Sequence, residues 1–176
     1  MIQIVKQTIE FYAKYLKTPT INEVKFEDES LLAKQWSVFV TIYKNWEIRW
    51  SAWNIKEIKS SLVWEIIENT IEAISKDTRF EPIKLDEVKD LKLRLDIITN
   101  RNVLKEWEIK KLDPVKNWVL AIKKDYENVA CILPNINPSL LTWGDFIPVL
   151  ESKLWIKKFD EKDYIIYSIE TEIFRD

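Results

Sequence analysis

One glycine, Gly144, in 176 residues is the feature that most limits how this chain can fold. Tight turns, hairpins and helix ends need residues that reach positive φ, and glycine does so without steric cost. Average usage of about 7% predicts roughly a dozen glycines in a chain of this length. The chain instead carries nine tryptophans. Its turns must therefore be built from unusual residues.

Several of these tryptophans stand where a glycine is expected. They are Trp46 and Trp118 at expected hairpin tips, Trp50 and Trp53 in an expected tight loop, and Trp155 at an expected helix end. In one interpretation they are aromatic anchors on the surface, each carrying roughly 150–250 Å² of largely apolar area. A left-handed backbone at such a residue costs about 1–2 kcal/mol.

In the other interpretation these positions are glycine in the organism. Some bacteria decode UGA as glycine and others decode it as tryptophan, so a bacterial gene of the first kind read with the second table gives this pattern. We favour this UGA glycine recoding, because the local turn rules and the composition agree with it. The hypothesis predicts a glycine-like backbone at all nine sites.

Composition excludes several classes of protein. The chain has no histidine, which removes the commonest general base and metal ligand, and its single cysteine, Cys131, rules out an internal disulfide framework. A net charge of −2 argues against nucleic acid as a partner, and no apolar run is long enough to span a membrane. We expect a cytoplasmic protein with no cofactor and no metal site. The oligomeric state stays open.

Hydrophobic periodicity indicates the α+β class. The spacing predicts helices over residues 2–17, 60–77 and 143–155, and strands over 37–44, 91–98, 118–124, 128–134 and 164–174. Asn45-Trp46, read as Asn-Gly, is the hairpin turn after the first strand. Because the helices and strands do not alternate strictly, we expect a mixed or antiparallel sheet flanked by helices.

Three ordered motifs point to one family. Residues 36–53 match G-x-F-V-T-L-(x)-G-x-L-R-G-C-I-G when tryptophan is read as glycine, residues 77–83 match D-P-R-F-x-P-L, and residues 131–135 match L-L-L-P-Q. This pattern resembles the AMMECR-type domain, the family of the Alport, midface hypoplasia and elliptocytosis candidate-region protein. Its bacterial and archaeal members include protein A of the AmmeMemoRadiSam systems.

The resemblance implies a single two-lobed domain over residues 1–176, with an activity that is not established. It also implies a companion protein as partner, either a radical enzyme or a metal-binding protein. In members of this family, the R-G-C-I-G loop is regarded as a functional surface. Here Ser51 replaces the cysteine of that loop, which puts any thiol chemistry in doubt.

The candidate binding residues follow from these motifs. They are Arg49, Trp50, Ser51, Trp53, Asn54, Arg79, Thr41 and Asn135. A glycine-flanked loop over 49–54 would point backbone N–H groups outward, and Arg49 would pair with a carboxylate or phosphate. Alternatively, the loop is a tight structural turn and Arg49 makes an internal ion pair. For Arg79, Thr41 and Asn135 a purely structural role is the favoured alternative.

Two functions stay open. The first is a binding or partner protein associated with a radical-enzyme system, and the second is a small enzyme that holds an anionic substrate at the Arg49–Asn54 loop. A row of carboxylates, Glu65, Glu68 and Glu72, could bind a cation, but we interpret it as a solvated helix face.

Overall fold

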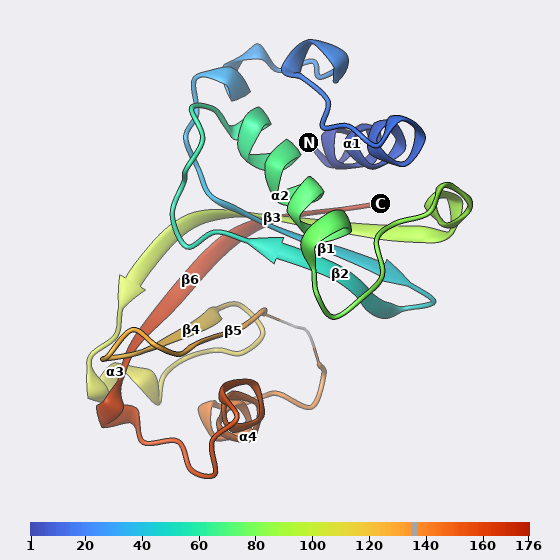
Figure 1. Ribbon diagram of the computed structural model, residues 1–176. Coiled ribbons are helices and arrows are strands. Elements are labelled where there is room, and N and C mark those ends of the chain that lie inside the picture. Colours follow the sequence, from blue (N-terminus) through green and yellow to red (C-terminus); the bar gives the residue numbers. More distant parts are fainter. Residues whose placement is uncertain (135–136) are drawn as a thin grey trace. The chain divides into compact units, whose positions relative to one another are not determined.

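The computed structural model describes residues 1–134 and 137–176. The α-helices are α1 (Ile2–Tyr15), α2 (Leu62–Lys76), α3 (Glu106–Ile109) and α4 (Trp143–Leu154). The 3-10 helices are η1 (Ile21–Glu23), η2 (Glu29–Leu32), η3 (Leu85–Asp90) and η4 (Glu161–Asp163). The strands are β1 (Val38–Lys44), β2 (Glu47–Trp53), β3 (Leu91–Val103), β4 (Trp118–Lys123), β5 (Val129–Ile132) and β6 (Tyr164–Arg175) (Figure 1).

The fold is α+β, with six strands in the order β2-β1-β3-β6-β4-β5. Strand β1 is antiparallel to β2 and β3, and β4 is antiparallel to β5 and β6. The chain divides into two compact units. The first unit is Met1–Ile98 with Glu172–Asp176, and the second unit is Thr99–Thr171. Among the described residues, every helix is too short or too polar to cross a bilayer.

The first unit is built on the β1–β2 hairpin, as the sequence predicts. Its turn residues Asn45 and Trp46 have φ of 53° and 67°. A two-residue turn with positive φ at both positions matches the twist of the flanking strands, and Asn-Gly is its preferred sequence. Trp46 adopts this conformation with 86% of its surface exposed, so no packing compensates the strain.

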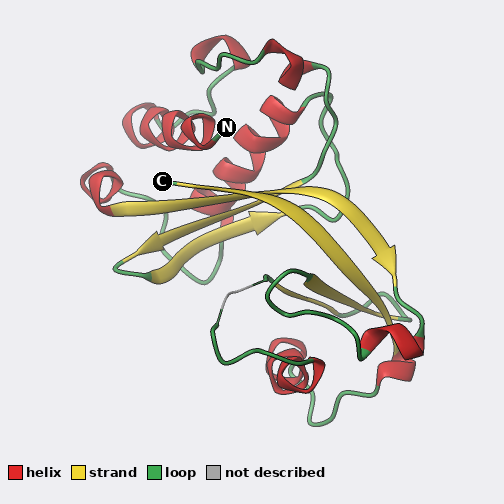
Figure 2. Ribbon diagram, turned by 180° about the vertical axis from the view of Figure 1, so that it is seen from behind, coloured by secondary structure: helices red, strands yellow, loops and turns green. Residues whose placement is uncertain are grey.

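The core of the first unit lies between one face of its strands and the helices α1 and α2, which Figures 1 and 2 show on the same side of β1, β2 and β3. The predicted alternation is confirmed. The strand residues of this core include Val38, Val40, Ile42, Leu93, Leu95 and Ile97, all buried. The opposite face is enclosed as well, because Thr41, Arg94 and Asp96 are at most 3% exposed.

The second unit packs α4 against its own strands. Phe146 and Leu150 of α4 are fully buried beside Val119 and Ile166. The helix ends as the sequence predicts. Trp155 follows it in the left-handed region with φ of 56°, and its N–H donates to the carbonyls of Glu151 and Ser152. This is the position where a helix most often carries glycine, and the Trp155 side chain is 95% exposed.

The expectation of a glycine-like backbone at all nine tryptophans is wrong. Among the described residues, Trp46 and Trp155 are the two tryptophans with positive φ. Trp50 and Trp118 were expected in a loop and at a hairpin tip, but they lie in β2 and at the start of β4 and are fully buried. Both indoles are therefore enclosed by neighbouring side chains, on extended backbone that accommodates any side chain.

Candidate functional site

Strand β2 carries half of the predicted site residues. The segment expected to be an open loop, residues 50–53, is the second half of this strand, so the predicted row of outward N–H groups is not formed as a loop. Because β2 lies at the edge of the sheet, it pairs with β1 on one side only. On the other side, the N–H of Ser51 donates to Asp77 Oδ2 at 3.1 Å. The segment after α2 therefore closes this part of the strand.

Arg49 is held by contacts within the first unit. Its Nη2 donates to the carbonyl of Glu81 at 3.1 Å, and its Nε lies 3.7 Å from Glu87 Oε1. Its guanidinium carbon lies 3.9 Å from the Trp50 ring centroid and 5.4 Å from that of Phe80. This geometry matches the internal ion pair that the sequence left open as an alternative. The side chain keeps 20% of its surface exposed.

Glu87 links Arg49 to a second cation. Its Oε1 accepts from Lys44 Nζ at 2.7 Å, and its side chain is 12% exposed. Burial raises the pKa of the Glu87 carboxyl, but the hydrogen bonds from Lys44 and from the Lys84 N–H, with the charges of Lys44 and Arg49, lower it below its ordinary value. Glu87 is therefore ionised wherever the cluster is folded near neutral pH.

Arg79 forms a bidentate ion pair with Asp77. Its Nε donates to Asp77 Oδ1 at 2.8 Å, and its Nη2 donates to Asp77 Oδ2 and to Ser51 Oγ, both at 2.7 Å. Burial opposes ionisation of Asp77, but the hydrogen bonds from Arg79 and from the Ser51 N–H hold its pKa below the ordinary value. The hydrogen bond to Asp77 also raises the pKa of Arg79. Arg79 is nevertheless 55% exposed.

The two predicted tryptophans of β2 are structural aromatics in this arrangement. Trp50 is fully buried, and its Nε1 donates to the Glu81 carbonyl at 3.0 Å. The half-buried ring of Trp53 stacks on Phe39, its partner across the β1–β2 pair, with centroids 5.8 Å apart and planes 11° apart. Both rings pack within the first unit.

Asn54 belongs to a separate hydrogen-bond network around Glu65. Its Nδ2 donates to Glu65 Oε1 at 2.9 Å, while the N–H groups of Ile58 and Lys59 donate to Oε2 at 3.0 and 2.8 Å. Glu65 is 1% exposed, so its interpretation as part of a solvated face is wrong. One sequence signal was available. Asn69, an unusual residue inside a helix, lies one turn later and also donates to Glu65.

Thr41 lies next to Ser51 in the β1–β2 register and opposite Arg94 of β3. Its side chain is fully buried, and its Oγ1 has no hydrogen-bond partner among the described residues. A buried hydroxyl without a partner is uncommon. Asn135, the remaining candidate, lies outside the described residues.

The structure thus brings four of the predicted residues together. We call this group the β2 arginine cluster: Arg49, Trp50, Ser51, Asp77, Arg79, Phe80 and Glu87. Asp77, Phe80 and Glu87 were not among the predicted site residues. Within the described part of the chain, no three histidine, cysteine, aspartate or glutamate side chains gather to hold a metal ion. What the cluster offers chemically is positioned guanidinium groups.

Comparisons with known proteins agree with the motifs. A family model described as AMMECR1 matches residues 2–174. A protein of Thermotoga maritima is 28% identical over 170 residues, which cover 96% of this chain and 93% of that protein. The crystal structure of an uncharacterised protein from Pyrococcus horikoshii superposes with a TM-score of 0.82 at 21% identity. The alignment covers 99% of this chain and 89% of that one, and it supports the fold alone.

Proposed function

We propose that this chain, which belongs to the AMMECR1 family, is a binding protein that recognises an anionic group at the β2 arginine cluster. The observation that carries the proposal is Arg79. Its guanidinium is fixed on one side by Asp77 and Ser51, yet the side chain is 55% exposed. An arginine whose orientation is already set loses little conformational entropy when it binds a ligand.

Both arginines of the cluster keep donors for a ligand. The hydrogen bonds of Arg79 use Nε and Nη2, and the contacts of Arg49 likewise use Nε and Nη2, which leaves Nη1 of each without a partner among the described residues. Each guanidinium carbon lies 5.4 Å from the ring centroid of Phe80. A carboxylate or phosphate near this ring would meet two cations on fixed side chains.

The partner we propose is a protein that presents an acidic side chain to this cluster. The family resemblance indicates a companion of the radical-enzyme or metal-binding kind. A surface of fixed arginines beside aromatic rings suits such a contact, since arginine and aromatic residues are enriched where protein interfaces carry most of their binding energy.

A small enzyme that holds an anionic substrate is the second candidate. It is favoured by the buried Oγ1 of Thr41, which has no partner among the described residues and belongs to the residue that pairs with Ser51. In an active site, the side chains that cover this hydroxyl would have to move apart before a substrate could hydrogen-bond to it.

Two probes at low salt test the proposal: a glutamate-rich peptide and inorganic phosphate. We expect the peptide to shift the amide NMR signals of residues 49–51 and 77–81. We also expect peptide binding to weaken about tenfold in each of the variants Arg79→Gln and Arg49→Gln. Lys110→Gln, at an exposed cation of the second unit, is the matched control. Added salt should weaken binding of the peptide.

The outcomes separate the two candidates. Binding of the peptide but not of phosphate supports the partner protein, whereas tight binding of phosphate that Thr41→Val abolishes supports the enzyme. If neither probe shifts the signals of the cluster, or if the arginine variants bind as the wild type does while remaining folded, the proposal is wrong.

A further inference from the structure

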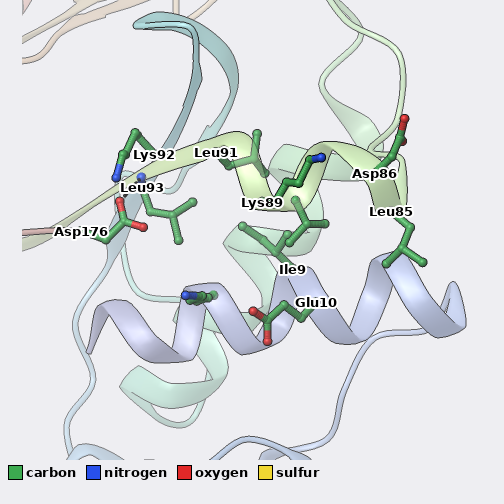
Figure 3. A pocket seen from close by; sticks show the side chains of 11 residues that line it. Ile9, Glu10, Leu85, Asp86, Lys89, Leu91, Lys92, Leu93 and Asp176 are labelled. Atoms are coloured by element: carbon green, nitrogen blue, oxygen red, sulfur yellow. Dashed lines mark hydrogen bonds between the residues drawn. The ribbon is translucent and has the colours of Figure 1, made fainter.

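The first unit contains a groove that shares no residue with the β2 arginine cluster. It lies between α1 on one side and η3 with the start of β3 on the other, and Asp176 closes one end (Figure 3). Its volume is about 590 Å³. Pockets for small molecules in proteins span roughly 300–1,000 Å³, so this groove is of the size that holds one small ligand.

The floor of the groove is apolar. Ile9 of α1 and Leu91 and Leu93 of β3 contribute to it and are 1%, 7% and 5% exposed. Leu85 of η3 lies at the end opposite Asp176 and is 60% exposed, which is unusual for a leucine that lines a hollow (Figure 3). A ligand with an apolar body would cover these side chains and remove the exposed part of Leu85 from water.

The rim carries three lysines: Lys6, Lys89 and Lys92. None of them forms an ion pair with any described residue, whereas cations on the strands of the same unit do. Figure 3 shows Lys92 beside Asp176 at one end of the groove. The Asp176 carboxylate is already engaged there, because its Oδ1 accepts from the Leu93 N–H at 2.8 Å.

Two further carboxylates lie on the rim, Glu10 and Asp86. Asp86 points away from α1 in Figure 3, and Glu10 extends from the outer side of that helix. The ends of the groove differ: Lys92 lies beside Asp176 at one end, while Lys89 lies toward the other end, which the exposed Leu85 marks (Figure 3).

We infer that this groove binds a small amphipathic carboxylate, with its apolar body on Ile9, Leu85 and Leu91 and its carboxylate beside Lys92. The lysines supply charge and hydrogen-bond donors for the head group, and the buried floor supplies apolar contact for the body. This site is independent of the proposed function, because its ligand contacts none of the residues of the β2 arginine cluster.

Three probes of equal length, octanoate, octan-1-ol and octylamine, test the inference by amide NMR titration of the whole chain. We expect octanoate to shift the signals of residues 6–10 and 85–93, to bind at least five times more tightly than octan-1-ol, and to bind far more tightly than octylamine. Equal binding of octanoate and octylamine, or shifts that map elsewhere, would overturn the inference.

Two variants separate the roles of the ends. Lys92→Glu should weaken octanoate about tenfold and leave octan-1-ol nearly unchanged, while Leu85→Asp should weaken both probes. Both positions are exposed, so neither change threatens the fold. Lys17→Glu, at an exposed lysine outside the groove, makes the same charge change and should leave octanoate binding unaltered. An equal effect of Lys17→Glu and Lys92→Glu would show general charge attraction and would also overturn the inference.

Discussion

The carboxylate of Asp77 accepts a hydrogen bond from the backbone N–H of Ser51 at 3.1 Å, which joins the end of α2 to strand β2. The same carboxylate accepts hydrogen bonds from the Nε, Nη2 and backbone N–H of Arg79. Its side chain is 5% exposed. A single buried carboxylate thus fixes both the strand and the most exposed arginine of the candidate site.

Replacing Asp77 with asparagine should destabilise the protein. The amide side chain would lack the charge that pairs with Arg79, and its one oxygen cannot replace both carboxylate oxygens. Hydrogen bonds to charged groups contribute about 1.5–3 kcal/mol, so we expect Asp77→Asn to lower the free energy of unfolding by about 2 kcal/mol in urea titrations. Asp90→Asn, at an exposed position, is the control and should change little. A neutral effect of Asp77→Asn would contradict the geometry.

The stability should also depend on pH in the acidic range. The pKa values of Asp77 and Glu87 are lowered in the folded protein. A carboxyl whose pKa is lower in the folded protein than in the unfolded chain stabilises the folded state fully above its unfolded pKa of about 4. This stabilisation disappears as the pH falls through the pKa of the folded protein. We expect the free energy of unfolding to fall from about pH 5 downwards. The Asp77→Asn, Glu87→Gln double variant should show a shallower fall, and parallel curves would count against both pairs.

Glycine should stabilise the protein at two tryptophans and destabilise it at a third. Trp46 and Trp155 have left-handed backbone and are 86% and 95% exposed. Glycine relieves the left-handed strain, and its greater freedom in the unfolded chain offsets part of this gain. We therefore expect Trp46→Gly and Trp155→Gly each to raise the free energy of unfolding by about 0.5–1 kcal/mol. Trp118→Gly should instead lower the free energy of unfolding by at least about 3 kcal/mol, because it removes a buried indole that also donates to Thr171 Oγ1 at 3.2 Å. Thermal melts compare the three variants.

The UGA recoding proposal has its own measurement. The intact mass of the protein made by its native host falls by one fixed step for each tryptophan that is glycine there. The backbone supports glycine most strongly at Trp46 and Trp155, and the enclosed indoles of Trp50 and Trp118 support it least. A mass equal to that of the printed sequence would end the proposal.

Glu65 of α2 should stabilise the loop that follows β2, because its carboxylate accepts hydrogen bonds from that loop. We expect Glu65→Gln to lower the free energy of unfolding by about 2–3 kcal/mol, because a neutral side chain cannot accept equally from the Ile58 and Lys59 amides and from Asn54. These two amides should also exchange faster with deuterium. Glu72→Gln, on the exposed part of the same helix, serves as the comparison.

Periodicity predicted the elements of this fold well. The expected helix over 143–155 is α4, and the strand over 37–44 is β1, because alternating or helical spacing of apolar residues reports which face is buried. Turn chemistry also located the Asn45-Trp46 hairpin. These features depend on residues close together in the sequence.

The candidate site was predicted less completely, for two physical reasons. Reading Trp50 and Trp53 as turn residues hid the continuation of β2, since a large side chain suits extended backbone. The contacts of Ser51 with Asp77 and of Arg49 with Glu87 join residues 26 or more positions apart, and no local pattern reports such pairs. Glu65 was misjudged for the same reason, because its burial depends on the loop that folds over it.

The Asp77 carboxylate has one more consequence, which concerns association between molecules. An exposed outer strand offers unpaired amides to any extended peptide, and such strands can recruit further copies into fibres. On β2 the outward amide of Ser51 is already occupied, and the charged Arg79 side chain lies beside it. Strand addition at this point would have to displace both groups, so this border of the sheet is protected against polymerisation.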